Sequence, residues 1–227
     1  MKTICVAGTQ SGVGKTSLVE MLLRVLKGWP RSNKLERGWS AAKISAGHAH
    51  GGEPFGIVTR RSLIAEPGTD TARFLAAGAK RVFWVWTMRN ALKNAVTELM
   101  GRLRRGENLI VEGNSFARAA RPDVTVMVAG VGRAEMKSSA RAILRKVDIV
   151  VLRVDRDDTA QDVAQAVKWW KDRAKVKDVF AVRSFQRGNA KFLRCVLKRL
   201  QQAPNEKPGF SQKPGFWCIH SRARCEQ

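Results

Sequence analysis

The 227-residue chain contains no tyrosine and only three histidines, and its acidic residues are scarce: 19 Asp and Glu stand against 42 Lys and Arg. The resulting formal net charge of +23 favours anionic partners such as nucleotides, phosphorylated cofactors, nucleic acid or a membrane surface. A basic surface without any such partner stays open as an alternative, because charge alone does not separate these cases.

Cysteine is also sparse. The four cysteines, Cys5, Cys195, Cys218 and Cys225, are scattered along the chain. This distribution argues against a disulfide framework and predicts free thiols in a reducing compartment, with Cys5 in the core. Cys218, His220 and Cys225 have a spacing that fits no established zinc pattern, so we expect a tail without metal.

Long apolar runs are missing as well. No stretch approaches the roughly 18 to 20 apolar residues that a transmembrane helix needs, and the first residues predict a strand instead of a signal peptide. We therefore expect a cytoplasmic protein with no membrane span.

A phosphate-binding loop is the clearest motif. An apolar strand at residues 3–7 leads into a glycine-containing loop at 8–14, and Lys15 and Thr16 open an apolar-periodic helix at 15–27. Glycines let backbone amides approach a polyphosphate, the lysine reaches the β and γ phosphates, and the threonine hydroxyl binds Mg²⁺. The predicted nucleotide contacts are Gly8, Thr9, Gln10, Ser11, Gly12, Val13, Gly14, Lys15, Thr16 and Ser17.

The loop is one residue longer than its common form, because five residues separate Gly8 from Gly14. This spacing resembles the loop of dethiobiotin synthetase and the cobyrinate amidases, in the SIMIBI class of P-loop proteins. The related ParA and MinD ATPases have a signature lysine where this chain has Gln10, which argues against that subgroup. A glycine-rich turn without a ligand remains the alternative.

Apolar strands alternate with amphipathic helices along the rest of the chain. This order predicts an α/β fold of three layers, αβα, with a mostly parallel sheet and the architecture of a P-loop NTPase. We expect a nucleotide-binding domain at 1–202 and a basic, mobile tail at 203–227 with two Lys-Pro-Gly-Phe repeats. Further strands are expected up to 45 and at 82–86, 109–111, 124–128, 149–154 and 179–182, and helices at 69–79, 89–105, 138–146, 161–174 and 190–201.

A long segment at 46–68 contains five glycines and two prolines and no predicted element. Such a long connection in a compact domain is typical of a lid or binding loop, so we expect it on the substrate side of the site. Its His48 and His50 form an H-x-H pair. They could contact a phosphate or a pterin, hold a metal together with Glu53, or simply be solvated.

Three residues at the expected carboxyl ends of strands or at a helix start complete the candidate site. Lys43 lies near the end of the second strand, and Glu112 closes a later one, where P-loop proteins keep an acidic Mg²⁺ ligand. Asp70 is a second acidic candidate. The alternatives are a surface acid for Glu112 and a helix-terminal role beside the cap Thr69 for Asp70.

Tryptophan is abundant, with seven residues. Together with the many arginines it leaves base stacking on nucleic acid open. Trp84 and Trp86 in a strand and Trp169 and Trp170 in a helix are equally well explained by core packing.

The order of these motifs resembles the MobB family, the P-loop GTP-binding adapter proteins of molybdopterin-guanine dinucleotide biosynthesis. The most specific piece is Gly68-Thr69-Asp70-Thr71-Ala72-Arg73 followed by Ala77-Gly78-Ala79, together with Val111-Glu112-Gly113. The family usually has the shorter loop and a histidine after the lysine, where this chain has Ile44. The loop length and Lys43 instead resemble dethiobiotin synthetase, in which a lysine helps to activate a carboxylate.

The resemblance implies a GTP- and Mg²⁺-binding accessory protein of molybdenum-cofactor biosynthesis with weak GTPase activity. It implies that Arg73, His48 and His50 contact nucleotide or substrate and that Thr16, Asp70 and Glu112 hold the metal. Molybdopterin, a nucleotidyltransferase and a second copy in a homodimer are the expected partners. An ATP-dependent carboxylate-activating ligase or small-molecule kinase, with Lys15 and Lys43 as catalytic residues, is the first alternative, and a nucleic-acid-binding NTPase the second. No guanine-recognition motif of the N/T-K-x-D type follows the late strands.

Overall fold

The computed structural model describes residues 1–27, 38–47, 52–132, 136–185 and 189–203. His48, His50 and the cysteines and histidine of the predicted tail lie outside these ranges. The boundary that we predict between a domain at 1–202 and a tail therefore stays a prediction.

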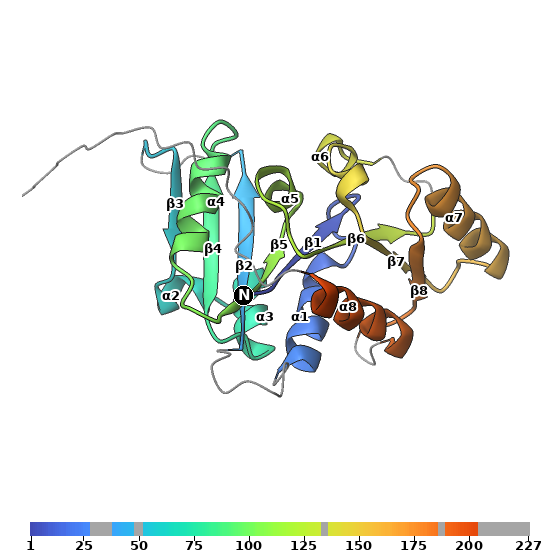
Figure 1. Cartoon of the computed structure of the whole chain (residues 1–227), viewed down its shortest axis with the longest axis horizontal. Helices are drawn as coiled ribbons and strands as arrows, with labels where there is room; N and C mark the ends of the chain where they lie inside the picture. Colours follow the sequence, from blue (N-terminus) through green and yellow to red (C-terminus); the bar gives the residue numbers. More distant parts are fainter. Residues whose placement is uncertain (28–37, 48–51, 133–135, 186–188, 204–227) are drawn as a thin grey trace, which may run out of the picture.

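One sheet of eight strands organises the described part of the chain, in the order β3-β4-β2-β5-β1-β6-β7-β8 (Figure 1). All pairings are parallel except that of β3 with β4. The strands are β1 (Thr3–Gly8), β2 (Trp39–Ala46), β3 (Phe55–Val58), β4 (Val82–Thr87), β5 (Asn108–Glu112), β6 (Val124–Gly130), β7 (Ile149–Arg153) and β8 (Asp178–Val182).

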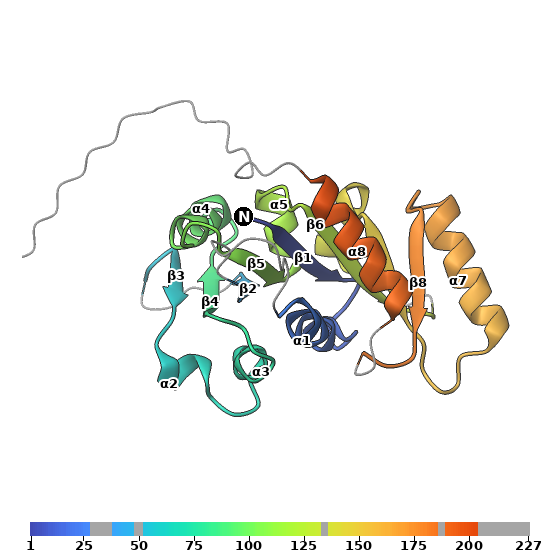
Figure 2. The same cartoon turned by 60° about the horizontal axis from the view of Figure 1, so that its bottom comes forward.

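Helices cover both faces of the sheet. Figure 2 shows α1 and α3 on one side of the strands and α4 and α5 on the other. The helices are α1 (Lys15–Leu26), α2 (Arg61–Ile64), α3 (Asp70–Ala76), α4 (Leu92–Gly101), α5 (Asn114–Ala119), α6 (Ser138–Arg141), α7 (Ala160–Asp172) and α8 (Ala190–Gln202), with a 3₁₀ turn η1 (Leu144–Lys146).

The core is divided by the sheet into two apolar clusters. Along β1, Ile4 and Val6 pack into the cluster with α1, α3 and α8, whereas Cys5 and Ala7 pack into the cluster with α4 to α7. Successive strand residues point to opposite faces, and a strand covered on both sides is apolar throughout. This confirms the predicted three-layer α/β fold with a mostly parallel sheet.

The prediction of a long connection without secondary structure at 46–68 is wrong. The segment contains the edge strand β3, antiparallel to β4, and the short helix α2. Four residues are too few to show an alternating pattern, and the surrounding glycines and prolines favoured a loop. Gly56 is needed there because a Cβ at this position would lie 2.4 Å from the Trp86 ring.

Other elements differ mainly at their ends. The helix predicted at 89–105 spans Leu92–Gly101, and the one predicted at 138–146 divides into α6 and η1. Helix α5 was not predicted, because it follows Gly113 directly and has too few residues for a periodic pattern. Helix ends depend on capping and tertiary contacts that apolar periodicity does not report.

Burial tests the predicted core position of Cys5 and the core-packing explanation for two tryptophans. Cys5 is fully buried, and this burial raises the pKa of its thiol to about 12. Trp170 is 4% exposed and belongs to the core, whereas its neighbour Trp169 is 38% exposed. Core packing therefore explains Trp170 but not Trp169.

Phe116 offers a test of how α5 is held on the sheet, since its side chain is fully buried among the residues of the second cluster. We expect Phe116→Ala to lower the free energy of unfolding by about 3 to 5 kcal/mol, through lost apolar burial and the cavity left behind. Urea unfolding followed by circular dichroism measures this. Met88→Ala, at a position 41% exposed, is the control, and an equal effect of both changes would contradict the packing of α5.

Candidate functional site

The strand register places the candidate residues side by side. Lys43 on β2 pairs with Glu112 on β5, and Glu112 pairs in turn with Val6 on β1. Paired residues of parallel strands project to the same face, so Lys43 and Glu112 are neighbours at the carboxyl edge of the sheet. The phosphate-binding loop leaves β1 at this same edge. This is where open α/β sheets bind ligands.

Four polar side chains meet at the start of α1. The Thr16 Oγ1 hydroxyl lies 2.9 Å from Asp70 Oδ1 and 2.9 Å from Glu112 Oε2. The Lys43 ammonium donates to Asp70 Oδ2 at 2.6 Å and also to Glu112 Oε1. The structure thus brings together the three predicted metal ligands and the predicted catalytic Lys43.

Asp70 has the helix-terminal position of the alternative, and its role as a metal ligand stays a prediction. Thr69 is the N-cap of α3, with its side chain accepting a hydrogen bond from the Ala72 amide, and Asp70 is the acidic residue of the first turn. The same carboxylate reaches Thr16 and Lys43. For Glu112 the alternative of a surface acid is wrong, because its side chain is only 1% exposed.

The chemistry of this cluster fits a magnesium ion. Two carboxylates and a hydroxyl offer oxygen ligands only, which Mg²⁺ prefers, and substrate phosphates and water complete such sites. Lys43 contacts both carboxylates, and Lys15 is close enough to interact electrostatically with both, so the two acidic charges are compensated by the chain itself. Within the described ranges no group of three or more His, Cys, Asp or Glu side chains forms a protein-only metal site.

Charge and burial oppose one another in the pKa values of this cluster. For Asp70, burial would raise the pKa, but the hydrogen bonds and charge of Lys43, with help from Thr16, lower it below its ordinary value. For Lys43, burial would lower the pKa, but Glu112 and Asp70 raise it. Burial lowers the pKa of Lys15, assisted by the charges of Lys43 and Lys137.

The loop itself has the backbone that its glycines predict. Gly12 and Gly14 adopt φ angles of 70° and 107°, in the left-handed region, which glycine enters at little cost. Gly14 is the N-cap of α1, without a side-chain cap and without an acidic residue in the first turn. The positive end of the helix is therefore left for an anion.

Gly8 has a different role. A Cβ at this position would lie 2.8 Å from the Cγ and Cδ atoms of Lys15 and from Val13 Cγ1. The missing side chain thus makes room for the Lys15 stem, whose ammonium donates to the Gln10 carbonyl at 3.1 Å. This geometry serves a lysine that reaches across the loop.

Three residues that hold the loop were not predicted. Asn114 exchanges two hydrogen bonds with the backbone of Gly8, at 2.8 and 3.0 Å. Lys137 donates its amide to the Thr9 carbonyl and its ammonium to the Ser11 hydroxyl, at 2.9 and 2.7 Å.

Arg153 is the third, donating to the Gly12 carbonyl at 3.0 Å. Asn114 could have been suspected from its position two residues after Glu112. Lys137 and Arg153 lie more than 120 residues from the loop in sequence and are brought to it only by the order of the strands.

Arg73 lies on α3 facing α1. Its guanidinium donates to Glu20 Oε2 at 2.7 Å and to Ser17 Oγ at 3.2 Å, and its side chain is 42% exposed. It therefore reaches Ser17, a predicted nucleotide contact on α1, and it also pairs with Glu20. His48 and His50 lie outside the described residues, and Glu53 is exposed.

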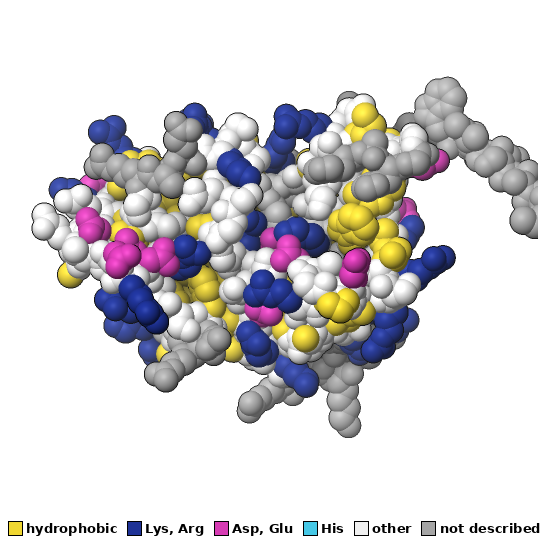
Figure 3. All heavy atoms as spheres, turned by 180° about the vertical axis from the view of Figure 1, so that it is seen from behind, with side chains coloured by type: hydrophobic (Ala, Val, Ile, Leu, Met, Phe, Trp, Pro, Cys, Tyr) yellow, Lys and Arg dark blue, Asp and Glu magenta, His cyan; other side chains and the backbone are white. Residues whose placement is uncertain are grey.

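The face seen in Figure 3 carries many basic side chains but no single basic patch. There the Lys and Arg side chains are spread across the face instead of forming one stripe. No helix in the described ranges has both the length and the apolar character needed to span a membrane.

Acid stability tests the charge state of Asp70. Since its pKa is lower in the folded chain than its ordinary value, the ionised carboxylate stabilises the fold above that value, and the contribution is lost as the pH falls through the lowered pKa. We expect the free energy of unfolding to fall more steeply for the wild type than for Asp70→Asn between roughly pH 5 and pH 3. Urea titrations at several pH values measure this. Asp157→Asn, at an exposed position, should keep the wild-type slope, and equal slopes for all three proteins would contradict the Lys43 contact.

Comparison with known proteins adds little beyond this geometry. No family model and no curated protein matches the chain. Among solved structures, signal recognition particle receptor FtsY from Elizabethkingia anophelis is similar at 14% identity and a TM-score of 0.41, covering 82% of this chain and 60% of that one. A structure of FtsY from the same organism in complex with GDP is similar at 15% identity and a TM-score of 0.40, covering 82% of this chain and 58% of that one. The chain thus spans about three fifths of these proteins, and its function has to be inferred from its own residues.

Proposed function

We propose that this chain binds a nucleoside triphosphate with Mg²⁺ at the loop of residues 8–16 and hydrolyses it slowly. The observation that carries the proposal is the meeting of Thr16, Asp70 and Glu112 at the start of α1, beside Lys15. A glycine-rich turn without a ligand would not need two carboxylates at its helix start. Lys43 and Thr16 compensate the buried charge of Glu112, and they hold its carboxylate at the helix start, where a P-loop protein binds Mg²⁺.

In this proposal the basic and the acidic residues of the site bind different parts of the ligand. Lys15 and the amides at the start of α1 would bind the phosphate oxygens, and Thr16, Asp70 and Glu112 would hold the metal. Mg²⁺, when bound, neutralises charge on the β and γ phosphates. Asn114, Lys137 and Arg153 keep the loop in place through their bonds to Gly8, Thr9, Ser11 and Gly12, so the amides are oriented before the ligand arrives.

The biological role that we propose is that of a GTP-binding accessory protein of molybdenum-cofactor biosynthesis. It rests on the motif order that resembles the MobB family, above all on residues 68–79 and Val111-Glu112-Gly113. In this role a molybdopterin derivative or a nucleotidyltransferase would be the partner, in the cytoplasm, and the chain would act as a homodimer. Arg73 beside Ser17 is then placed to respond to nucleotide through α1.

Removing the loop lysine tests the nucleotide site. We expect Lys15→Ala to weaken binding of a fluorescent GTP analogue by roughly a hundredfold, since a charge-assisted contact to phosphate is lost. Titration by fluorescence anisotropy with Mg²⁺ measures this, and unlabelled ATP should compete less well than GTP. Lys168→Ala, on the exposed face of α7, is the matched control. Equal binding by both variants would disprove the nucleotide site, and stronger competition by ATP would disprove the GTP-specific role.

A second candidate function is favoured by the position of Lys43. Its ammonium contacts both Asp70 and Glu112, in the carboxyl-terminal half of β2, and its side chain is 24% exposed, so it is accessible to a substrate. A cation there could receive the carboxylate of a substrate next to the transferred phosphoryl group. The chain would then be an ATP-dependent carboxylate-activating enzyme of the dethiobiotin synthetase type.

Turnover with carboxylic acids separates the two functions. If the second candidate holds, some member of a carboxylate panel should stimulate ADP release at least roughly tenfold, and Lys43→Gln should abolish the stimulation while nucleotide binding persists. Coupled-assay kinetics with ATP and Mg²⁺ measure the release. Basal turnover that no carboxylate changes would remove this candidate and leave the first one standing.

A further inference from the structure

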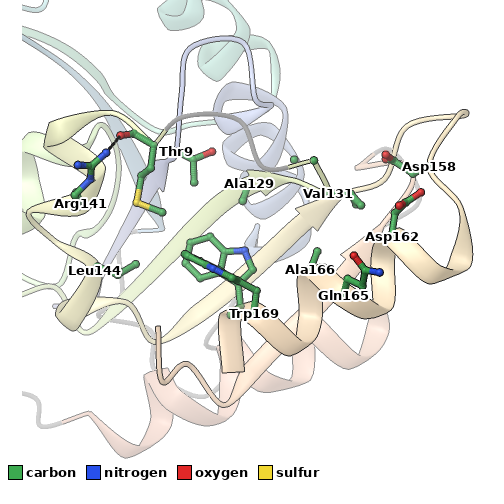
Figure 4. Close-up of a pocket in the computed structure, with 14 residues that line it drawn as sticks. Thr9, Ala129, Val131, Arg141, Leu144, Asp158, Asp162, Gln165, Ala166 and Trp169 are labelled. Carbon is green, nitrogen blue, oxygen red and sulfur yellow. Dashed lines mark hydrogen bonds between the residues drawn. The ribbon is translucent and has the colours of Figure 1, made fainter. Parts of the chain in front are cut away.

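A hollow lies beside the phosphate-binding loop, on the face of the sheet that α6 and α7 cover. Its volume is about 640 Å³, and it is bounded by α7, by α6 with the residues before it, and by the carboxyl end of β6 (Figure 4). This size is typical of small-molecule sites. Lys15, Thr16, Lys43, Asp70 and Glu112 are not in its lining, but Thr9 of the phosphate-binding loop is.

The floor of this cavity is apolar and includes an accessible tryptophan. Ala129, on β6, Val131, just after β6, and Leu144 line it together with Trp169 and Trp170. The two indole rings meet edge to face at 5.1 Å, with Trp170 buried and Trp169 38% exposed. A half-exposed indole held by a buried one is a rigid surface on which a planar ring can stack.

Polar groups of opposite charge lie at the two ends. Figure 4 shows Arg141 at one end and Asp158 and Asp162 at the other, with Trp169 between them. Arg141 donates to the Met136 carbonyl at 3.0 Å and lies at the end opposite the aspartates, with which it forms no ion pair. The aspartate end is therefore a local negative site in a chain of net charge +23.

Each aspartate has an oxygen available. Asp158 accepts the Asp155 amide at 2.6 Å and Asp162 accepts the Thr159 amide at 3.0 Å, in both cases through Oδ2. Oδ1 of neither aspartate accepts a hydrogen bond from a described residue. The bonds through Oδ2 fix the carboxylates, and the outer oxygens can bind a ligand that carries N–H donors.

We propose that this cavity binds a planar aromatic molecule with a cationic or paired N–H group. The ring stacks on Trp169, and the N–H groups donate to Asp158 and Asp162. An aromatic ring suits the apolar floor, and charge complementarity selects the cationic end. Apart from Thr9, this cavity shares none of its lining with the predicted nucleotide contacts, and the proposal for it does not require that nucleotide binds.

The shared wall at Thr9 couples the two sites. The Thr9 carbonyl accepts the amide of Lys137, the residue after the cavity-lining Met136, and the Lys137 ammonium donates to Ser11 in the loop. A ligand that shifts Met136 therefore also shifts the contacts of the loop, and by reciprocity nucleotide changes the affinity of the cavity for its ligand. This coupling, unlike the cavity, rests on the proposed function.

The probe for the cavity is 4-aminobenzamidine, a fluorescent planar cation, titrated into the full chain. Competition with 4-aminobenzoate, which reverses the charge, and with acetamidine, which lacks the ring, tests both parts of the proposal. Unlabelled benzamidine, which keeps both the ring and the charge, is the positive control and should displace the probe. We expect 4-aminobenzoate and acetamidine to bind at least roughly tenfold more weakly than benzamidine. Equal competition by either of them would overturn the proposal.

Two variants locate the probe. Trp169→Ala and Asp158→Asn should each weaken binding roughly tenfold, and the matched controls Lys168→Ala and Asp157→Asn, whose side chains do not line the cavity, should not. Asp158→Asn keeps an acceptor for the Asp155 amide, so it decides the question even if Trp169→Ala fails to fold by circular dichroism. Wild-type affinity in a folded Asp158→Asn variant would overturn the site.

Adding GTP and Mg²⁺ tests the coupling. The dissociation constant of the probe should change at least roughly threefold in the wild type and stay constant in Lys15→Ala, which keeps the cavity intact. If GTP binds and the constant does not change, the coupling is wrong. If GTP does not bind to the wild type, the proposed function fails while the result for the cavity stands.

Discussion

The contact of Lys43 with two carboxylates is the constraint on which the site depends. Asp70 and Glu112 come from α3 and β5, and their negative charges would repel one another at the start of α1 without a cation between them. Lys43 supplies that cation from β2, so one ammonium group joins three elements. Because Glu112 is almost fully buried, loss of Lys43 would leave a charge away from water, which costs more than a surface ion pair is worth. The cluster therefore joins three elements of the fold at the start of α1.

The phosphate-binding loop is prepared in a comparable way, through its backbone. Asn114 follows β5, Lys137 precedes α6 and Arg153 ends β7, and each makes a hydrogen bond to a loop residue. These residues lie on both sides of β1 in the sheet. Strands β2 to β5 lie on one side of β1 and β6 to β8 on the other, so the loop leaves the sheet at its topological switch point. A loop held from several elements loses little further entropy when it binds an anion, which favours affinity. The cavity beside α7 lies at the same edge of the sheet, and Thr9 of the loop is part of its lining.

The sequence predicted the parts of this site that are local. The strand, the glycines and Lys15 with Thr16 lie within fourteen residues, and the backbone of the loop follows from them: Gly12 and Gly14 take left-handed conformations, and Gly8 makes room for Lys15. Glu112 was singled out from its position at a strand end, and its burial excludes the alternative of a surface acid. The strand β3 could not be predicted, because only its antiparallel pairing with β4 stabilises Phe55–Val58 as a strand.

Apolar periodicity and the glycine-rich loop, both local properties, determined the fold class, the position of the loop and the acidic residue at the end of β5. The tertiary structure alone decided which distant residues meet. The register of β2 against β5 sets Lys43 beside Glu112, and the strand order brings Lys137 and Arg153 to the loop. It also separated two adjacent tryptophans, burying Trp170 and leaving Trp169 open in a cavity. Periodicity reports which face of an element is apolar, whereas the neighbours of a side chain depend on how the whole sheet is assembled.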